Sequence, residues 1–504
     1  MSETGVGLSE LPNGWAWTTA KEIAEFIRGV SYKKSESSKT PKEDFVPILR
    51  ANNINSQLDY ADLVYVPQER IKDEQFIKAF DIVIAMSSGS KNLVGKAAQS
   101  YQDYHGGFGT FCGLVRVSPQ LNRELIGLFF QSPDYRNKIS RLSSGMNINN
   151  LRGEHIESMS VPIPSLSEQH RIVAKIEELF TKLDAGIKEL HKAHSQLKRY
   201  RQSVLKAAFE GKLTEAWRTK HQDEIEPASA LLERILKERR EKWETEQLEQ
   251  MQAKGEMPKD DKWKTKYNEP ITPDTSDLPE LPNGWVWTTL PQIGELNRGK
   301  SKNRPRNAPF LYGGRYPFVQ TGDIKQANGL IRHYNLTYSE EGLKQSRLWP
   351  AGTLCITIAA NIADTAILGF NACFPDSMVG FLPERGQCNI YFVEFFLRTA
   401  KEDLERYAPA TAQKNINLAI LKDLAIPFPS LAEQNIIAQE IDRYLSVADE
   451  VEKTITAELK RAEQLRQSIL KKAFSGKLVP QDPNDEPASV LLERIKAEKQ
   501  IALW

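Results

Sequence analysis

The chain has 504 residues, of which 40% are hydrophobic and 26% charged, a balance that indicates a soluble globular protein and excludes a disordered or fibrous one. This length exceeds what one hydrophobic core supports, so we expect several domains. The 67 basic and 66 acidic residues nearly cancel, so the net charge neither supports nor excludes a nucleic-acid partner, and the local distribution of charge must decide.

The sequence gives no sign of a membrane or secretory protein. No apolar run reaches the roughly 18 to 20 residues that cross a bilayer, and the first residues form no signal peptide. We therefore expect a cytoplasmic protein that has no membrane partner. The four cysteines lie far apart without a CxxC pair, so neither a disulfide framework nor a thiolate zinc site is indicated.

The chain contains one unit twice. Three stretches recur in the same order: Leu-Pro-Asn-Gly-Trp from Leu11 and Leu281, Arg-Gln-Ser-(Val/Ile)-Leu-Lys from Arg201 and Arg466, and Glu-Pro-Ala-Ser from Glu226 and Glu486. The distance in sequence between the two copies, for example from Leu11 to Leu281, is too long for a solenoid, whose repeats measure roughly 20 to 50 residues. Two related halves predict a pseudo-two-fold molecule that offers similar surfaces twice. Duplex DNA is a suitable partner for such a molecule.

Each unit begins with a mixed segment, residues 15 to 164 and 285 to 429. Short β-rich runs such as Asp81–Ala85 and Leu354–Ile358 alternate there with turns of Gly, Asn, Ser and Pro. We predict a compact domain of the α/β (α+β) class in each segment.

A long helix is predicted after each mixed domain. Ser165 with Glu168, and Ser430 with Glu433, fit the capping box, in which the Ser hydroxyl and the Glu carboxylate satisfy each other's backbone amides. Apolar residues then follow at heptad spacing: Ile172, Ile176, Leu179, Leu183, Leu190, Leu197 and Val204 in the first copy, and Ile437, Ile441, Tyr444, Ala448, Ile455, Ala462 and Ile469 in the second.

The first of these helices should run from Leu166 to Glu210, a length of about 68 Å. Gly211 and Gly476 stand where a helix C-cap is expected. An apolar stripe of this length needs a partner, and the other copy is the natural one. We therefore expect an antiparallel coiled coil that acts as a ruler. The highly charged residues 228 to 265 suggest a second, exposed helix and then a linker.

Basic clusters recur at the same place in both mixed domains. Arg28-Gly29 and Arg298-Gly299 each begin a positive segment rich in Ser, Asn, Pro or Gly, which should form a loop that enters a groove or follows phosphates. An ordinary solvated loop is the alternative, and the recurrence argues against it.

Polar segments flank these loops and could contact base edges. Residues 50 to 54 align with 320 to 324, and 147 to 149 with 415 to 417, although Asn and Asp are also common turn formers. The candidate DNA-binding residues are Arg28, Tyr32, Lys33, Lys34, Arg50, Asn52, Asn53, Ser88, Ser90, Lys91, Asn147, Asn149, Arg298, Lys300, Lys302, Arg304, Arg306, Thr321, Asp323, Asn361, Lys414, Asn415 and Asn417.

Motifs for catalysis are not evident. Residues 89 to 97 nearly match a P-loop, but one residue too many separates the glycines, and Ala97 stands where Ser or Thr must hold Mg²⁺. His191 and His194 lie three apart without a third metal ligand. The sequence therefore does not support an enzyme.

These features together resemble the specificity subunit of type I restriction-modification systems over essentially the whole chain. The resemblance lies in the paired Leu-Pro-Asn-Gly-Trp stretches, the Pro-Ser-Leu-(Ser/Ala)-Glu-Gln helix starts at 164 to 169 and 429 to 434, and the Arg-Gln-Ser-(Val/Ile)-Leu-Lys stretches. Phe-Glu-Gly-Lys-Leu at 209 to 213 and Phe-Ser-Gly-Lys-Leu at 474 to 478 complete it. The order of these stretches is more specific than any one of them.

The resemblance implies two target recognition domains, each of which reads half of a split DNA sequence, and helical regions whose length sets the spacer. We expect the first recognition domain at 1–164, the central helical region and linker at 165–270, the second recognition domain at 271–429 and the distal helical region at 430–504. The resemblance also implies three kinds of partner, namely double-stranded DNA, two modification subunits and restriction subunits. It implies no catalytic residue, cofactor or metal on this chain. S-adenosylmethionine, ATP and Mg²⁺ would belong to the partner subunits.

A coiled-coil adaptor that joins partner subunits without reading DNA is the alternative function. The nearly neutral charge and the large helical fraction favour it.

Overall fold

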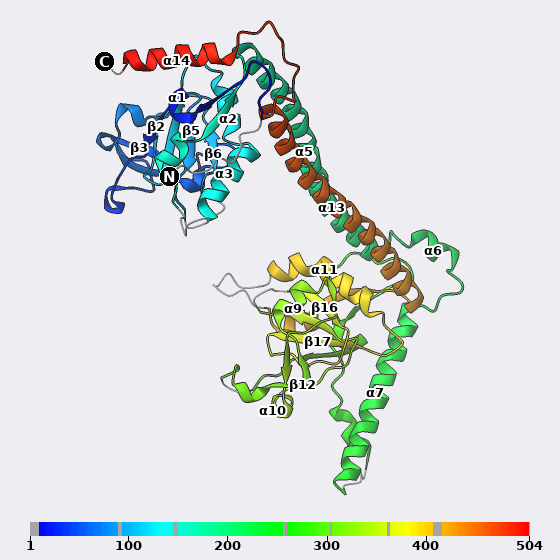
Figure 1. Cartoon of the computed structure of the whole chain (residues 1–504). Coiled ribbons are helices and arrows are strands. Elements are labelled where there is room, and N and C mark those ends of the chain that lie inside the picture. The colour runs from blue at the N-terminus through cyan, green and yellow to red at the C-terminus, as the bar shows by residue number, and fades with distance from the viewer. Residues whose placement is uncertain are drawn as a thin grey trace. The chain divides into compact units, whose positions relative to one another are not determined.

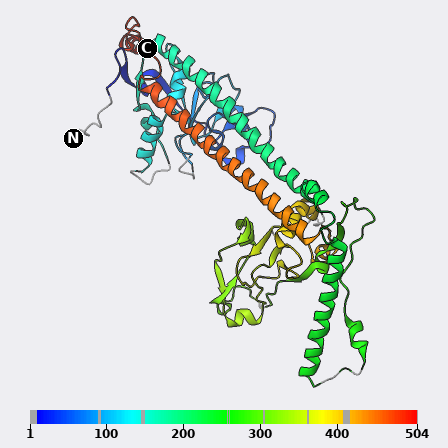
Figure 2. The same ribbon diagram turned by 90° about the vertical axis from the view of Figure 1, so that its right-hand side faces the viewer.

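The computed structural model describes residues 10–88, 93–144, 150–255, 258, 260–302, 305–359, 363–406 and 416–502. It divides into two compact units, each formed by segments that are distant in the sequence. Unit 1 combines Met1–Lys192 with Ile455–Trp504, and unit 2 is Ala193–Thr454. Each unit therefore holds one mixed domain and a part of both long helices. Figures 1 and 2 show the elements from two sides.

The mixed domain of unit 1 contains three small sheets, with the strand orders β2-β8-β5-β6, β4-β3-β7 and β1-β9. The strands are β1 (Ala16–Thr19), β2 (Ala24–Arg28), β3 (Phe45–Leu49), β4 (Val64–Pro67), β5 (Ile82–Ala85), β6 (Ala97–Gln99), β7 (Gly107–Phe108), β8 (Cys112–Val117) and β9 (Ser160–Ile163). The helices are α1 (Ala20–Ile23), α2 (Arg123–Phe129), α3 (Pro133–Ser144) and α4 (Gly153–Glu157), with 3-10 turns at Lys34–Glu36, Ala51–Asn53, Gln68–Arg70 and Asp73–Gln75.

The mixed domain of unit 2 repeats this plan with the sheets β11-β17-β15-β16-β13, β12-β14 and β10-β18. Its strands are β10 (Val286–Thr289), β11 (Gly294–Arg298), β12 (Tyr312–Phe318), β13 (Gly329–Ile331), β14 (Leu336–Tyr338), β15 (Leu354–Thr357), β16 (Thr365–Leu368), β17 (Met378–Pro383) and β18 (Ala425–Phe428). Its helices are α8 (Leu290–Ile293), α9 (Thr321–Gln326), α10 (Glu340–Lys344), α11 (Ile390–Arg406) and α12 (Leu418–Asp423), with a 3-10 turn at Pro309–Leu311. The prediction of two α/β domains is confirmed.

The two apolar runs singled out in the sequence are central strands. β5 and β15 are buried at every residue, because each has a neighbouring strand on both sides and side chains packed on both faces. The large core of unit 1 continues from the sheet onto both long helices, through Ile172 and Ile176 on one and Ile469 on the other.

The long helices α5 (Leu166–Phe209) and α13 (Leu431–Phe474) each have 44 residues, or about 66 Å. In unit 1, Arg466 of α13 binds Asp184 and stacks on Phe180 of α5. In unit 2, Arg201 of α5 binds Asp449 and Glu452 of α13, each at 2.7 Å.

In unit 2, His194 of α5 lies beside Glu452 of α13, and Arg201, further along α5, binds Asp449, which is earlier on α13. The two helices therefore run in opposite directions, and the predicted antiparallel pairing is confirmed. The heptad positions form the seam. Six of the seven on α13 are buried isoleucines and alanines, and Ile172, Ile176 and Val204 are buried on α5. Gly211 and Gly476 end the helices at φ +71° and +66°, the left-handed conformation expected of a C-cap glycine.

The predicted capping boxes are half correct. The Ser165 and Ser430 hydroxyls accept the backbone N–H of Glu168 (3.1 Å) and Glu433 (3.2 Å). The two carboxylates do not return to the serine amides. The Glu168 carboxylate instead accepts the indole N–H of Trp15 at 3.0 Å, and the Glu433 carboxylate accepts the indole N–H of Trp285 at 2.8 Å. The repeated Trp and Glu thus lock the first strand of each mixed domain to its long helix.

A helix begins in each unit at the Glu-Pro-Ala-Ser stretch. The N–H of Ala488, the first residue of α14 (Ala488–Ala502), donates to the Gly14 carbonyl at 2.8 Å, and α14 lies beside α1 in unit 1 (Figure 1). The N–H of Ala228, the first residue of α7 (Ala228–Ala253), donates to the Gly284 carbonyl at 3.1 Å in unit 2. The distal segment of the sequence therefore completes the first mixed domain.

The charged segment after residue 228 forms the predicted helix, α7, and then turns back along it (Figure 2). Trp263, in the 3-10 segment Asp261–Lys266, stacks on Trp243 of α7 with 6.0 Å between ring centroids. The short helix α6 (Glu215–Lys220) precedes α7. No helix within the described residues is both long and apolar enough to cross a membrane.

Candidate nucleic-acid interface

One end of the main sheet gathers four of the predicted segments in unit 1. Strands β2 and β5 both run antiparallel to β8 and end beside its first residues, since Arg28 pairs with Gly113 and Ala85 with Cys112. The N–H of Leu151 donates to the Met86 carbonyl at 2.7 Å, which brings the chain after residue 149 to the same place.

The end of β3 joins them. The N–H of Gly109 donates to the Leu49 carbonyl (2.9 Å), and the N–H of Val30 donates to the Phe108 carbonyl (2.7 Å). Residues 28–34, 50–53, 87–88 and 150–151, with the turn 109–112, therefore form one surface. We call this end of the sheet the loop edge of unit 1.

Unit 2 has the same arrangement. β11 and β15 end beside the first residues of β17, since Arg298 pairs with Val379 and Thr357 with Met378. The N–H of Ile416 donates to the Ile358 carbonyl at 3.1 Å. The loop edge of unit 2 consists of residues 298–302, 305–306, 320–323, 358 and 416–417, with the turn 375–377.

The repeated glycine in each Arg-Gly pair is required by close backbone packing. A Cβ on Gly29 would lie 2.1 Å from the Gly109 carbonyl oxygen, and one on Gly299 would lie 2.3 Å from that of Pro375. Any side chain there would push the basic loop away from the turn that precedes the next strand. The Arg-Gly pair in the sequence therefore marks the place where two loops of the edge touch.

Cations protrude from the loop edge of unit 1. Arg28, Lys33 and Lys34 are exposed, and within the described chain none of them forms an ion pair. Lys33 donates its backbone N–H to Glu36, whose carboxylate binds Arg70 at 2.8 Å. Glu36 is thus already paired with Arg70, and the three exposed cations are available to phosphates.

Other predicted residues of unit 1 serve the domain itself. Arg50 binds Asp62 at 2.9 Å, and Asn53 is 1% exposed. The Asn53 side chain accepts the Arg50 N–H and donates to the Ala61 carbonyl, so both of its polar groups are occupied. Tyr32 is half-buried, and this burial raises its pKa. Asn52 beside them is exposed.

Asp376 organises the basic loop of unit 2. Its carboxylate binds Arg306 at 2.9 Å, and its carbonyl oxygen accepts the Arg298 Nε–H. Lys300 and Lys302 are exposed and, in the part of the chain that is described, have no ion pair. The two arginines therefore fix the loop, while the two lysines point their charge outward.

A small cavity of about 270 Å³ opens beside this loop. The cavity is lined by Ser301, Arg306, Gln320 and Thr321. The structure thus brings the basic loop after Arg298 together with the polar segment at 320 to 324. Hydroxyl, amide and guanidinium groups in one cavity match the donors and acceptors that read base edges.

Asp323 and Asn417 act as turn residues. Asp323 accepts the Gln320 N–H at 2.8 Å, as Asn53 accepts the Arg50 N–H in unit 1. Asp323 also accepts the Asn335 amide at 3.0 Å. Asn417 caps α12 by accepting the Ile420 N–H at 3.0 Å. Asp323 and Asn417 therefore form a turn and a helix cap, as the turn-forming alternative predicted.

Of the remaining predicted residues, Ser88 is half-buried at the loop edge of unit 1. Eight others lie outside the described residues, namely Ser90, Lys91, Asn147, Asn149, Arg304, Asn361, Lys414 and Asn415. Contact of any candidate residue with DNA stays a prediction.

One residue of the loop edge was missed. Phe111 is 66% exposed in the turn before β8. In the sequence it stands next to an apolar strand, where a Phe normally belongs to the core. Only its position between Gly109 and the first residue of the strand, in a Gly-rich turn, could have indicated exposure.

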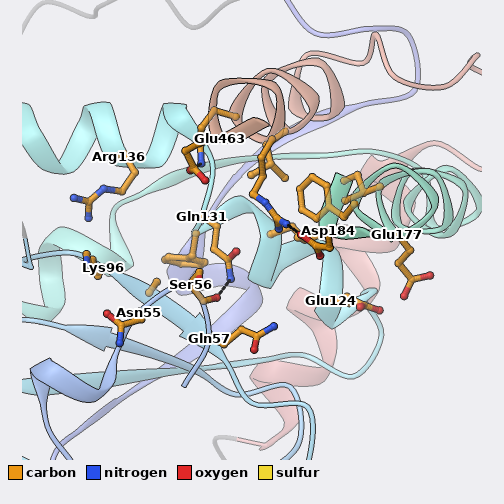
Figure 3. Close-up of a pocket in the computed structure, with 18 of the residues that line it drawn as sticks. Asn55, Ser56, Gln57, Lys96, Glu124, Gln131, Arg136, Glu177, Asp184 and Glu463 are labelled. Carbon is orange, nitrogen blue, oxygen red and sulfur yellow. Dashed lines mark hydrogen bonds and ion pairs between the residues drawn. The ribbon is translucent and has the colours of Figure 1, made fainter. Parts of the chain in front are cut away.

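A cavity of about 1050 Å³ in unit 1 lies between the mixed domain and the long helices. Figure 3 shows Lys96, Gln131 and the loop 55–57 on one side, and Glu177, Asp184 and Glu463 from α5 and α13 on the other. Burial raises the pKa of Glu124 at its wall, and the Glu177 carboxylate adds to this. Carboxylates repel phosphates, so the cavity is a poorer DNA site than the loop edge.

Metal chemistry has no visible site within the described ranges, where no three His, Cys, Asp or Glu side chains gather in a group that could hold an ion. The four cysteines are buried. His194 lies 3.1 Å from the Glu452 carboxylate across the helix pair, a contact between helix surfaces.

Known proteins place the chain in a family. The model of the family described as type I restriction modification DNA specificity domain matches residues 12–192 and 282–461. The chain is 31% identical to the type I restriction enzyme EcoKI specificity subunit of Escherichia coli strain K12, over 97% of this chain and 96% of that protein. It is also 31% identical to the StySPI specificity subunit of Salmonella potsdam, over 98% and 97%.

Solved structures agree in fold. The HsdS subunit from Thermoanaerobacter tengcongensis matches with a TM-score of 0.51 at 18% identity, over 94% of this chain and 99% of that one. A chain from work on complex assembly and conformational transition of the type I R-M system matches with a TM-score of 0.64 at 16% identity, over 93% and 100%. The family model and the two relatives together show that this chain belongs to the type I restriction enzyme specificity subunits.

Proposed function

We propose that this chain reads an asymmetric, two-part DNA sequence, one part with the loop edge of each unit. The supporting observation is the convergence of the same four segments at the same end of both sheets. Their residues differ, since unit 1 offers Arg28, Lys33 and Lys34 where unit 2 offers Lys300 and Lys302. Similar scaffolds with different loops should contact phosphates in the same way and bases differently.

Catalysis would belong to partner subunits. Two modification subunits would bind S-adenosylmethionine and methylate adenine, and restriction subunits would use ATP and Mg²⁺. The paired helices α5 and α13 are the proposed docking surface for the modification subunits, because each helix carries one copy of the repeated Arg-Gln-Ser-(Val/Ile)-Leu-Lys stretch. This chain would contribute sequence specificity and no reacting group.

Selection of DNA by the purified complex of this chain with its modification subunits tests the proposal. A random duplex library should be enriched in one motif with two specified parts separated by an unspecified spacer. Enrichment of a single contiguous motif would contradict reading by two separate edges. A lack of any enrichment would favour the alternative of an adaptor that joins proteins without reading DNA.

The helices should also set the spacer. We expect that inserting four residues, about one turn, into both α5 and α13 lengthens the preferred spacer by up to about two base pairs, since four residues add about 6 Å and a base pair takes about 3.4 Å. Both half-sites should stay the same, as the library selection would show.

The matched control places the insertion in α5 alone. This shifts one side of the seam against the other and should destabilise the helix pair. A spacer that does not change after the double insertion would show that the helices do not measure distance.

A further inference from the structure

Phe111 is an apolar side chain in polar surroundings at the loop edge of unit 1. It is 66% exposed, so its ring adds little to the stability of the folded domain. Its neighbours at this edge are Ser87, Ser88 and the basic strand end at Arg28. An exposed phenyl ring is therefore offered outward next to hydroxyl groups and a cation.

Hydrogen bonds fix the backbone that carries this ring. Phe111 belongs to a tight turn in which the Cys112 N–H donates to the Gly109 carbonyl at 2.8 Å. The Phe111 carbonyl accepts two further amides, from Met86 at 2.8 Å and Ser87 at 3.1 Å. A ring on such a turn loses little freedom when it binds, so a single contact can contribute measurably to affinity.

The surroundings indicate which partner the ring suits. A protein-binding hot spot is normally ringed by other apolar or aromatic side chains. The loops beside this turn instead carry Ser87, Ser88 and Arg28, with Tyr32 half-buried, and hydroxyl and guanidinium groups bind phosphates and base edges. In the major groove, base edges carry hydrogen-bond donors and acceptors, and the apolar group among them is the C5-methyl of thymine.

Unit 2 differs at the equivalent place. The N–H of Ile358 donates to the Ser377 carbonyl at 3.0 Å, just as that of Met86 donates to Phe111. A hydroxymethyl group therefore replaces the phenyl ring on the second loop edge. The two edges, alike in backbone, would select different bases at this point.

We propose that Phe111 packs against the C5-methyl group of one thymine in the half-site bound by unit 1 and so specifies that base pair. The inference rests on the proposed DNA-reading function and adds to it one residue and one base. It concerns van der Waals contact only, with no bond made or broken.

Uracil substitution tests the contact directly, since uracil pairs like thymine but lacks the methyl group. The probe is the duplex that the wild-type complex enriches from the random library, with each thymine of both half-sites replaced in turn. One uracil should weaken binding of the wild-type complex about fourfold, the amount expected for one methyl-sized apolar group. Phe111→Ser should bind the thymine probe about tenfold more weakly, as for one lost base-pair contact, and should not distinguish thymine from uracil there.

Two variants control for folding and exposure. Phe111→Leu keeps an apolar side chain and should keep part of the preference for thymine. Tyr101→Ser removes another exposed ring, 55% accessible, just beyond the opposite end of β6, and should keep all of it.

Three results would overturn the inference. Binding by the wild-type complex that no uracil weakens is the first, and an unchanged thymine preference in Phe111→Ser is the second. The third is a Phe111-dependent rise in fluorescence of a 2-aminopurine placed beside the thymine, which would show that the ring enters the base stack. If the wild-type complex enriches no motif, the proposed function fails as well, whereas a motif indifferent to Phe111 contradicts this inference alone.

Discussion

Replacing Glu433 by Gln should lower the free energy of unfolding of unit 2 by about 3 kcal/mol, whereas Glu168→Gln should leave unit 1 unchanged or slightly more stable. The two glutamates hold equivalent places at the start of α13 and α5, and both are 2% exposed. The different outcome follows from the charge of their partners.

Glu433 has a charged partner. Its carboxylate accepts hydrogen bonds from Trp285 Nε1, from the Thr214 hydroxyl at 2.7 Å and from Arg218 Nε at 2.9 Å. The Arg218 side chain is 16% exposed. A glutamine would leave this largely buried guanidinium without its counter-charge, and breaking a buried pair from one side is costly.

Glu168 has neutral partners. It accepts hydrogen bonds from Trp15 Nε1 and from the Gln481 amide at 3.3 Å, while the neighbouring Arg171 is bound to Asp485 at 2.7 Å. Burial raises the pKa of Glu168 above its usual value of 4.5. A raised folded-state pKa favours folding at acidic pH, and this contribution is lost as the pH rises through that pKa. At neutral pH the charge therefore costs stability, and an amide removes the cost.

Hydrogen exchange of each unit in increasing urea measures the two changes separately, which a single unfolding curve of a two-unit chain cannot do. Arg218→Gln in the Glu433→Gln background is the matched control, and it should recover part of the lost stability, since both charges are then absent. Equal effects of the two glutamine substitutions would contradict the argument from Arg218.

The helices and the duplication could be predicted because their signals are local or periodic. Heptad spacing from Ile172 to Val204, a serine at the start and Gly211 at the end determine a helix by themselves. The role of the glutamates could not be predicted in the same way. Ser165 and Glu168 fit a capping box, yet tertiary packing brings Trp15, 153 residues away, to the carboxylate.

The candidate interface was predicted in pieces. The basic loops and polar segments were found because they recur, but their convergence depends on bonds such as that from Leu151 to Met86, which no local pattern encodes. Local patterns also could not separate the exposed Asn52 from the buried Asn53. Phe111 was missed because exposure is decided by the turn that carries it, whereas residue type alone suggests a core position.

Removing the outward-pointing cations of both loop edges should weaken DNA binding strongly and reduce its dependence on salt. The variant carries Arg28→Ala, Lys33→Ala, Lys34→Ala, Lys300→Ala and Lys302→Ala. Each contact between a cation and a phosphate releases about 0.9 counter-ion. Loss of five such contacts should therefore make the slope of log affinity against log salt concentration shallower by about 4 to 5. At low salt the affinity should fall by at least about a hundredfold, because the electrostatic contribution of these phosphate contacts is lost.

Titration of the selected duplex at several salt concentrations measures both quantities, with this chain in complex with its modification subunits. Lys237→Ala with Lys262→Ala serves as the control, because these lysines are 77% and 88% exposed in α7 and in the 3-10 segment after it, outside the loop edges, and are paired with Glu241 and Asp260. The control should keep the slope of the wild-type complex. A basic loop that follows phosphates must contribute to the salt dependence of binding. If the loop-edge variant keeps both the slope and the affinity of the wild-type complex, these loops do not face DNA. The adaptor that joins subunits without reading DNA is then the better account.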